Sequence, residues 1–497
     1  MRPLEFARAA RVLAGPLAFA LVWLLLPEHF PDAEGTPVVF SSAGRATLAM
    51  TAWMAIWWLT EAVPLEATSL LPVALFPLLG IAGIAGATAP YASDVVFLFL
   101  GGFMLAAGLQ RWGLDRRIAF AVLARAGSQP AQVLAAVMIA TTLLGLWVSN
   151  SATAAIMIPI AVSIAGFARF DDEAAAGRFA AALVLAVAYS ASIGGMGTLI
   201  GTPPNGIAAR VIAQETGSPI SFAHWSLIAA PPVMLMLLAC WWLLARGLPR
   251  ALPGAAAATR AAIVRARAEL GPIEGGARIT LAVGAFAAAL WITRPLLTQI
   301  EFGTLQPFAG LTDPGIAIGA ALALFVLPAG RGEPGRAAPR LLDWSSAARL
   351  PWGVLVLFGG GLSLAAAIQA NGVAEFIAAQ SAALAGWPPL LVLVFVLAVT
   401  VFLSELTSNT AQAATMIPLL AAMAPALGVE PVLLILACGL GSSCAFMMPV
   451  GTPPNAIAFG TGLVTMRQMR RTGLRLNLIA IVVLCVTLAL WVPVVYG

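Results

Sequence analysis

Four short polar stretches interrupt a chain that is otherwise rich in apolar residues. Two are built on a Ser-Asn pair, Ser149-Asn150-Ser151 and Ser408-Asn409-Thr410, and two read Gly-Thr-Pro-Pro-Asn, Gly201 to Asn205 and Gly451 to Asn455. Hydroxyl and amide groups can donate hydrogen bonds to an anion, and their oxygen atoms suit a hard cation such as sodium. The types and spacing of these residues therefore indicate a binding site for a small anion and accompanying cations.

The composition places these stretches in a membrane protein. The chain has 497 residues, of which 61% are hydrophobic and only 9% are charged, whereas soluble domains carry about 25% charged residues. The net charge of +5 comes from arginines in short loops, with no basic face for a nucleic acid. The four cysteines stand singly in apolar runs and show no CxxC spacing, which favours packing residues over metal ligands or disulfides.

Apolar segments that could cross a bilayer recur along the chain. Because a span needs about 20 apolar residues, we predict about 11 spans, at residues 12–26, 46–60, 67–88, 95–110, 179–212 (interrupted), 222–245, 279–297, 312–329, 352–370, 431–465 (interrupted) and 476–495. Two further apolar pairs, 131–148 with 152–168 and 385–407 with 411–427, are broken at the Ser-Asn pairs. We expect each pair to form a re-entrant hairpin in an all-α polytopic membrane protein.

The arginine-rich segments set the expected topology. They are the N-terminus, 246–278, 331–349 and 467–475. Cytoplasmic loops are enriched in basic residues, and with both hairpins re-entrant all four segments fall on one side. The sequence therefore predicts a multi-pass protein of the cytoplasmic membrane, with its N-terminus inside and its C-terminus outside.

The two halves of the chain repeat each other. The Ser-Asn pairs lie 259 residues apart, as do two Met-Ile-Pro segments, while the Gly-Thr-Pro-Pro-Asn copies lie 250 residues apart. Arg111–Arg117 contains three arginines and its counterpart, Ala370–Phe376, contains none, so we expect the halves to be inverted in the membrane. Inverted repeats with broken helices are typical of secondary transporters. The expected divisions are an N-terminal span and outer loop (1–45), a first repeat (46–245, hairpin tip 149–151), a cytoplasmic linker (246–278) and a second repeat (279–497, hairpin tip 408–410).

The polar stretches can form one anion site if they meet within the membrane. Helices that start at about Ala152 and Ala411 would direct free amides and positive dipole ends at an anion. The paired prolines of the other two stretches keep the backbone open, because proline cannot continue a helix. A single stretch of this kind could merely end a helix, but four matched copies favour a site.

These motifs resemble the divalent-anion/sodium symporter family, whose members carry dicarboxylates, citrate and sulfate. Trp57 to Pro64 also resembles an early segment of that family, and the resemblance covers nearly the whole chain. It implies a homodimer that works by an elevator motion and couples transport to sodium ions. It implies anion contacts at Asn150, Ser151, Thr202, Pro203, Asn409, Thr410, Thr452 and Pro453. It also implies two sodium sites, one at Gly145, Ser149, Asn150 and Gly201 and the other at Ser404, Asn409 and Gly451.

Two positions depart from the family pattern, and one carboxylate stands out. Ser151 replaces a threonine but keeps its hydroxyl group, whereas Gly145 stands where a hydroxyl residue is expected. If a side-chain oxygen matters there, the first sodium site weakens and a sodium-independent exchanger becomes an alternative. Glu405 lies beside the second tip, and a carboxylate within a membrane is a functional candidate. It either takes part in proton or sodium movement or makes a structural hydrogen bond.

We therefore predict secondary active transport of small divalent anions coupled to sodium. The substrates would be di- or tricarboxylates such as succinate, malate or citrate, or else sulfate. The alternatives are the sodium-independent dicarboxylate exchanger and a related ion or oxyanion permease, such as a sodium/proton antiporter or an arsenite carrier. A membrane enzyme is disfavoured, because the sequence has no His-Glu-x-x-His, Gly-x-Ser-x-Gly or Walker motif.

Overall fold

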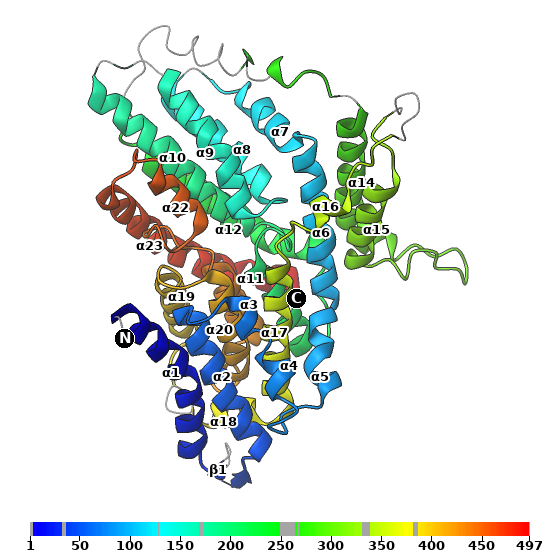
Figure 1. Ribbon diagram of the computed structural model, residues 1–497, viewed down its shortest axis with the longest axis vertical. Coiled ribbons are helices and arrows are strands. Elements are labelled where there is room, and N and C mark those ends of the chain that lie inside the picture. Colours follow the sequence, from blue (N-terminus) through cyan, green and yellow to red (C-terminus); the bar gives the residue numbers. More distant parts are fainter. Residues whose placement is uncertain are drawn as a thin grey trace.

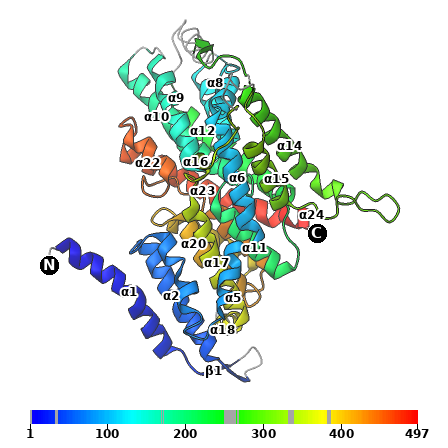
Figure 2. The ribbon, with the colours of Figure 1, turned by 45° about the vertical axis from the view of Figure 1, so that its right-hand side comes forward.

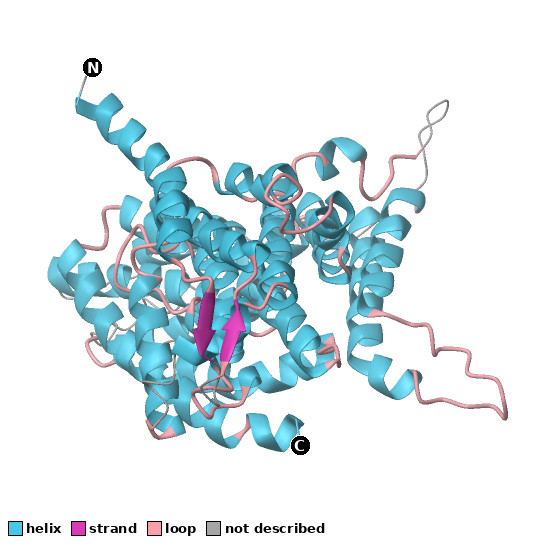
Figure 3. Ribbon diagram, turned by 90° about the horizontal axis from the view of Figure 1, so that it is seen from below, coloured by secondary structure: helices cyan, strands magenta, loops and turns pink. Residues whose placement is uncertain are grey.

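The computed structural model describes residues 3–31, 36–127, 129–167, 170, 172–248, 264–265, 268–273, 275–330, 338–380 and 386–496. Helices dominate this part of the chain, and its one sheet pairs two short antiparallel strands, β1 (His29–Pro31) and β2 (Pro37–Val39) (Figure 3). The linker predicted at 246–278 falls largely outside the described residues.

Three groups of helices follow one another along the chain (Figure 1). The first comprises α1 (Pro3–Leu25), α2 (Ser42–Thr60), α3 (Leu65–Thr68), α4 (Leu71–Leu75), α5 (Ile84–Thr88), the 3-10 helix η1 (Ala89–Ala92), α6 (Asp94–Arg111) and α7 (Leu114–Leu123). The second comprises α8 (Pro130–Gly145), α9 (Asn150–Phe167), α10 (Glu173–Gly195), α11 (Pro203–Thr216) and α12 (Phe222–Ala245). The third comprises α14 (Gly275–Leu297), α15 (Asp313–Val326), α16 (Trp344–Ala347), α17 (Trp352–Ala370), α18 (Val373–Gln380), α19 (Pro389–Leu403), α20 (Asn409–Met423), α21 (Pro431–Gly441), α22 (Pro453–Gly460), α23 (Met466–Leu490) and α24 (Val492–Tyr496).

Helix length and composition fit a membrane protein. Within the described residues, six helical stretches are long and apolar enough to cross a bilayer: Ile84–Arg111, Glu173–Gly195, Phe222–Ala245, Gly275–Leu297, Trp352–Ala370 and Met466–Tyr496. Shorter apolar helices accompany them, among them both helices of the first expected hairpin. The predicted mainly helical, apolar class is thus confirmed, while the count of about 11 spans stays a prediction.

One predicted span is wrong. Residues 67–88 form no continuous helix, because the chain there is divided among α3, α4 and α5. Pro77 has no N–H with which to extend α4, and Gly80 adopts a φ of 67°, which favours glycine. The chain turns at this point, where the Ile81 N–H donates to the Phe76 carbonyl over 2.9 Å. The long helical stretch that follows begins only at Ile84.

The helices after the two Ser-Asn pairs begin slightly earlier than predicted. α9 and α20 start at Asn150 and Asn409, two residues before the expected starts at Ala152 and Ala411. The Ser408 side chain caps α20 by accepting a hydrogen bond from the backbone N–H of Ala411. A serine N-cap satisfies a free amide of the first turn, so the asparagine that follows it already belongs to the helix.

The broken helices of the two halves interlock. α10 and α11 form the discontinuous helix of the first half, and α21 and α22 form that of the second. α11 packs against α20 and α21, whereas α22 packs against α9 and α10 (Figure 1). The short helix of each half, α11 or α22, therefore packs against a hairpin helix and a broken helix of the other half. This packing brings the four breaks together.

The remaining helices surround this centre. α1 packs on α2 at one edge of the molecule, and α14 and α15 pack on α6 at another (Figure 2). α2 and α17 both lie against α20. The second Ser-Asn tip is therefore held between the other half's broken helix and helices from outside the hairpins.

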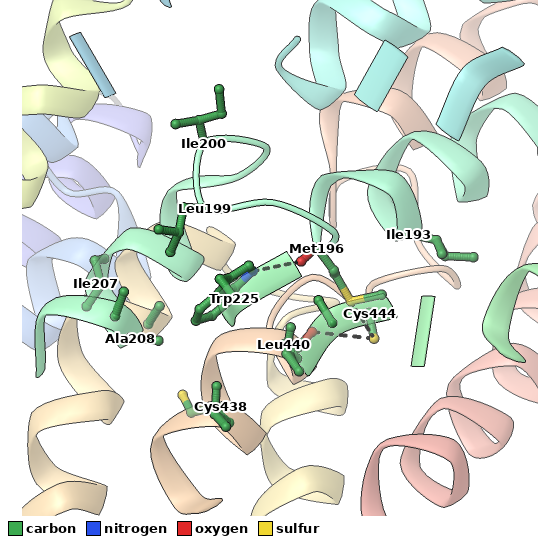
Figure 4. Close-up of a cluster of buried hydrophobic side chains, with 14 of the residues drawn as sticks. Ile193, Met196, Leu199, Ile200, Ile207, Ala208, Trp225, Cys438, Leu440 and Cys444 are labelled. Atoms are coloured by element: carbon green, nitrogen blue, oxygen red, sulfur yellow. Dashed lines mark hydrogen bonds between the residues drawn. The ribbon is translucent and has the colours of Figure 1, made fainter. Parts of the chain in front are cut away.

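A buried cluster connects the break between α10 and α11 to the end of α21 (Figure 4). The Met196 carbonyl accepts a hydrogen bond from the Trp225 indole over 3.0 Å, and the Met196 sulfur lies 4.0 Å from the Cys444 sulfur. The Cys444 thiol also donates to the Leu440 carbonyl over 3.6 Å. All four cysteines are buried and free of disulfides, as the sequence predicts.

Candidate functional site

The four breaks enclose one cavity of about 970 Å³. Its wall includes the first residues of α9, α11, α20 and α22, so four helix N-termini begin there. All eight residues predicted to contact the anion line it: Asn150, Ser151, Thr202, Pro203, Asn409, Thr410, Thr452 and Pro453. Three further residues predicted to bind sodium also line it: Ser149, Gly201 and Gly451. The structure therefore brings together motifs that lie far apart in the sequence.

The cavity wall combines four helix N-termini with the absence of a basic side chain among its described lining residues. Among its described lining residues, Glu61 at the end of α2 is the one ionisable group, and it is acidic. Each helix N-terminus carries roughly half a positive elementary charge and presents free backbone amides. Two or more N-termini at one cavity can bind an anion. An anion bound there would need cations beside it to balance the rest of its charge.

The tip asparagines each carry a buried side-chain oxygen that is a candidate ligand for such a cation. Asn150 Oδ1 and Asn409 Oδ1 are both buried and have no hydrogen-bond partner among the described residues. Because both asparagines line the cavity, these two oxygens are candidate ligands for a cation. Carbonyl groups at the ends of α8, α10, α19 and α21 accept turn or side-chain hydrogen bonds, as Thr142 does from the Leu146 N–H and Gly195 from the Asn205 amide, and each carbonyl oxygen has a second lone pair. Amide oxygens and carbonyls are ligands that a hard cation such as sodium prefers.

The first expected cation site lies where α8 and α10 end. A Cβ atom built on Gly195 would overlap Asn150 Oδ1, and one built on Gly201 would overlap the Gly195 carbonyl. These three residues therefore meet closely. Gly145 is buried, does not line the cavity, and packs α8 onto α10, since a Cβ there would lie 3.1 Å from the Ala191 carbonyl. Sequence reasoning missed Gly195, although the Gly194-Gly195 doublet before the break was a signal.

The second expected cation site lies where α19 ends. Ser404 is fully buried behind the cavity wall, and its hydroxyl donates to the Val401 carbonyl over 2.8 Å. The lone pairs of that hydroxyl stay available to a cation. Gly451 packs against Glu405, because a Cβ on this glycine would lie 3.3 Å from Glu405 Oε2. The second site thus has a side-chain oxygen and a nearby carboxylate, and the first has neither at the equivalent positions.

The last asparagine of each Gly-Thr-Pro-Pro-Asn stretch holds its break in shape. The Asn205 amide nitrogen donates to the carbonyls of Gly195 and Thr198 over 2.9 and 2.7 Å. The Asn455 amide nitrogen donates to the carbonyls of Ala445 and Met448, each over 3.0 Å. Sequence reasoning gave these asparagines no role of their own, yet their repetition in both copies was the signal for one.

Glu405 makes the structural hydrogen bonds that were one of its two predicted roles. The backbone N–H groups of Phe446, Met447 and Met448 donate to its carboxylate over 2.7, 2.8 and 2.9 Å. The Asn477 amide of α23 adds a fourth hydrogen bond over 2.7 Å. Together these bonds fix the turn that follows α21.

The fold and the site define a class of protein: a polytopic helical membrane protein whose broken helices surround one polar cavity, the architecture of secondary transporters. The chain belongs to the sodium:sulfate symporter family, since the sequence model of that family's transmembrane region matches residues 10–497. The resemblance found in the paired motifs is thereby confirmed.

Relatives of this chain extend the comparison. It is 38% identical to the sodium-dependent dicarboxylate transporter SdcS of Staphylococcus saprophyticus, over 98% of this chain and 92% of the relative. It is also 38% identical to SdcS of Staphylococcus aureus, over 100% of this chain and 93% of the relative. Among solved structures, the YdaH transporter of Alcanivorax borkumensis matches with a TM-score of 0.58 over 98% of each chain. Because its sequence identity is 14%, that likeness concerns the fold alone.

Proposed function

We propose that this protein is a secondary active transporter that moves small dicarboxylates, such as succinate or malate, across the cytoplasmic membrane together with sodium. The observation that carries the proposal is the cavity with four helix N-termini, two buried amide oxygens without partners and no basic side chain among its described lining residues. Such a wall attracts an anion but does not balance its charge. Two sodium ions supply that balance, and the name of the Staphylococcus relatives supports both the ion and the substrate class.

Each hairpin tip serves one end of the substrate and one sodium ion. The amides of Asn150 and Asn409 donate to the two carboxylate groups, with the hydroxyls of Ser151 and Thr410 beside them. Thr202 and Thr452 add hydroxyls, and Pro203 and Pro453 shape the wall. One sodium ion binds Asn150 Oδ1 and backbone oxygens at Gly145, Ser149 and Gly201. The other binds Asn409 Oδ1, backbone oxygens at Gly451 and the Ser404 hydroxyl.

The same proposal includes the membrane arrangement. The helix pairs α8 with α9 and α19 with α20 are re-entrant hairpins, and the two halves form an inverted repeat. The hairpins move together with the discontinuous helices as one body in a homodimer. The reciprocal packing of α11 on α20 and of α22 on α9 supports two equivalent halves. The start of α1 and α24 lie at opposite edges of the molecule in Figure 2, and the proposed topology has the N-terminus inside and the C-terminus outside.

A sodium-independent dicarboxylate exchanger is the second candidate, and one position favours it. Gly145 brings no side-chain oxygen to the first cation site, whereas Ser404 brings one to the second. An exchanger would take up succinate without sodium only when the vesicle interior already holds a dicarboxylate. A sodium/proton antiporter fits less well, because Glu61 is the one carboxylate among the described residues that line the cavity.

Uptake into proteoliposomes tests the coupling. We expect an inward sodium gradient to drive uptake of labelled succinate at a rate at least about tenfold above the rate in choline, because the anion's charge is unbalanced without sodium. Unlabelled malate should compete, and citrate and sulfate should be compared beside it. Equal uptake in choline would contradict sodium coupling, and uptake that appears in choline only after preloading with succinate would establish the exchanger instead.

A further inference from the structure

Thr142, near the end of α8, carries a buried hydroxyl group without a hydrogen-bond partner. The residue is 7% exposed, and its Oγ1 contacts no donor or acceptor among the described residues. Its neighbour Thr141 behaves as helical threonines often do, since its hydroxyl donates to the Val137 carbonyl of the preceding turn over 2.7 Å. Other buried hydroxyl groups of the chain also lack a partner. The position of Thr142 therefore decides what its hydroxyl can do.

Thr142 lies where α8 packs on α10, next to the first expected cation site. A Cβ atom built on Gly194 would stand 2.9 Å from Thr142 Cα, and one built on Gly195 would overlap Asn150 Oδ1. The glycine doublet thus touches Thr142 with one residue and the buried oxygen of Asn150 with the next. Gly145 packs on the same segment, because a Cβ there would lie 3.4 Å from the Gly195 nitrogen. Thr142 therefore belongs to the group of residues that surrounds this site.

The internal repeat shows that the two halves place a hydroxyl group at different positions. At the offset of 259 residues, Gly145 corresponds to Ser404, and Thr142 corresponds to Val401. The first half therefore has a hydroxyl at 142 and none at 145, whereas the second half has the reverse. Positions 142 and 145 are three residues apart in α8, so they lie on the same face of the helix. A hydroxyl at either position can serve the same side of α8.

We propose that Thr142 is a ligand of the first sodium ion, and that its hydroxyl supplies the side-chain oxygen that Gly145 lacks. The lone pairs of a hydroxyl oxygen suit a hard cation, and no hydrogen bond to the described residues occupies them. The ion then has two side-chain oxygens, Thr142 Oγ1 and Asn150 Oδ1, besides the backbone oxygens. This inference rests on the proposed sodium coupling, and it explains how the first site keeps its sodium affinity although residue 145 is a glycine.

Substitutions at Thr142 separate the hydroxyl from the shape of the side chain. Thr142→Val replaces the hydroxyl with a methyl group, and we expect the half-saturating sodium concentration of succinate uptake to rise at least about tenfold. Thr142→Ser keeps the hydroxyl, and the rise should stay within about threefold. The matched control is Thr141→Val, because the Thr141 hydroxyl is bonded within its own helix. It should leave the sodium dependence unchanged.

Sodium binding without transport gives a second readout. Thermal unfolding of the purified protein, in a sodium series balanced with choline and without succinate, should show stabilisation by sodium. In Thr142→Val this stabilisation should require more sodium, by a factor similar to that seen in uptake. An unchanged sodium response in Thr142→Val, or an equal shift in Thr142→Val and Thr142→Ser, would overturn the inference. If Thr142→Val fails to fold, Thr142→Ala removes the same hydroxyl and is measured in its place.

A sodium-bound experimental structure tests the same inference without any substitution. Thr142 Oγ1 should lie within about 2.6 Å of the first sodium ion. A Thr142 hydroxyl that instead donates to the Met138 carbonyl of its own helix would contradict the inference. If the unsubstituted protein shows neither sodium-driven uptake nor stabilisation by sodium, the proposed sodium coupling itself is wrong. That outcome is seen without any variant, so it is distinct from a failure of Thr142 alone.

Discussion

Asn409→Ala should reduce sodium-driven succinate uptake at least about 100-fold while the protein still purifies as a folded species. The side chain has two proposed tasks, since its Nδ2 donates to the substrate and its buried Oδ1 binds sodium. A hydrogen bond to a charged group contributes about 1.5–3 kcal/mol, and alanine removes this contact and a cation ligand together. Labelled-succinate uptake, with thermal unfolding as a check of folding, measures the effect.

A second substitution at the same position divides the two tasks. Asn409→Asp keeps an oxygen for sodium but replaces the amide donor with a negative charge that repels the anion. We expect succinate uptake to be lost while sodium still raises the unfolding temperature. The control on the same helix is Thr415→Val, because the Thr415 hydroxyl bonds only the Ala411 carbonyl of its own helix among the described residues. Uptake by Asn409→Ala close to that of the control would remove the site assignment.

Gly195→Ala should impair the first cation site selectively. The added methyl group would overlap Asn150 Oδ1, so the side chain must turn away from the position where it is expected to bind sodium. We predict a fall in uptake of about tenfold or more. The sodium dependence should also change from cooperative, with a Hill coefficient of about two, to simple, with a coefficient of about one.

The matched control for this change is Gly177→Ala in the same helix, α10, where an added methyl group meets nothing within 4 Å. It should leave the rate and the sodium dependence unchanged. If Gly195→Ala retains cooperative sodium dependence at a normal rate, the first cation site lies elsewhere.

Much of the fold could be predicted because apolar runs and their interruptions are local signals. The predicted spans at 222–245 and 352–370 have the bounds of α12 and α17. The breaks between α8 and α9 and between α19 and α20 fall at the Ser-Asn motifs, as predicted. Residues 67–88 misled the prediction, since the run stays apolar while Pro77 and Gly80 turn the backbone. Hydropathy alone cannot reveal a break made by residues that are themselves apolar or neutral.

The site was predictable to the extent that it is repeated in the sequence. The internal repeat selected the residues that line the cavity, because two halves with matching motifs can meet around one ligand. Asn477 could not be found this way, since it reaches Glu405 from α23 and has no motif around it. The hydrogen bonds of Glu405 were equally hidden, because the turn at Phe446–Met448 that donates them lies about 40 residues further along the chain.

An experimental structure of the purified protein in sodium and succinate tests the central claim most directly. The account predicts one dicarboxylate between the tips at Asn150 and Asn409, with sodium ions at the amide oxygens and no arginine side chain within hydrogen-bond distance of either carboxylate. Succinate bound outside this cavity, or held there by an arginine, would contradict it.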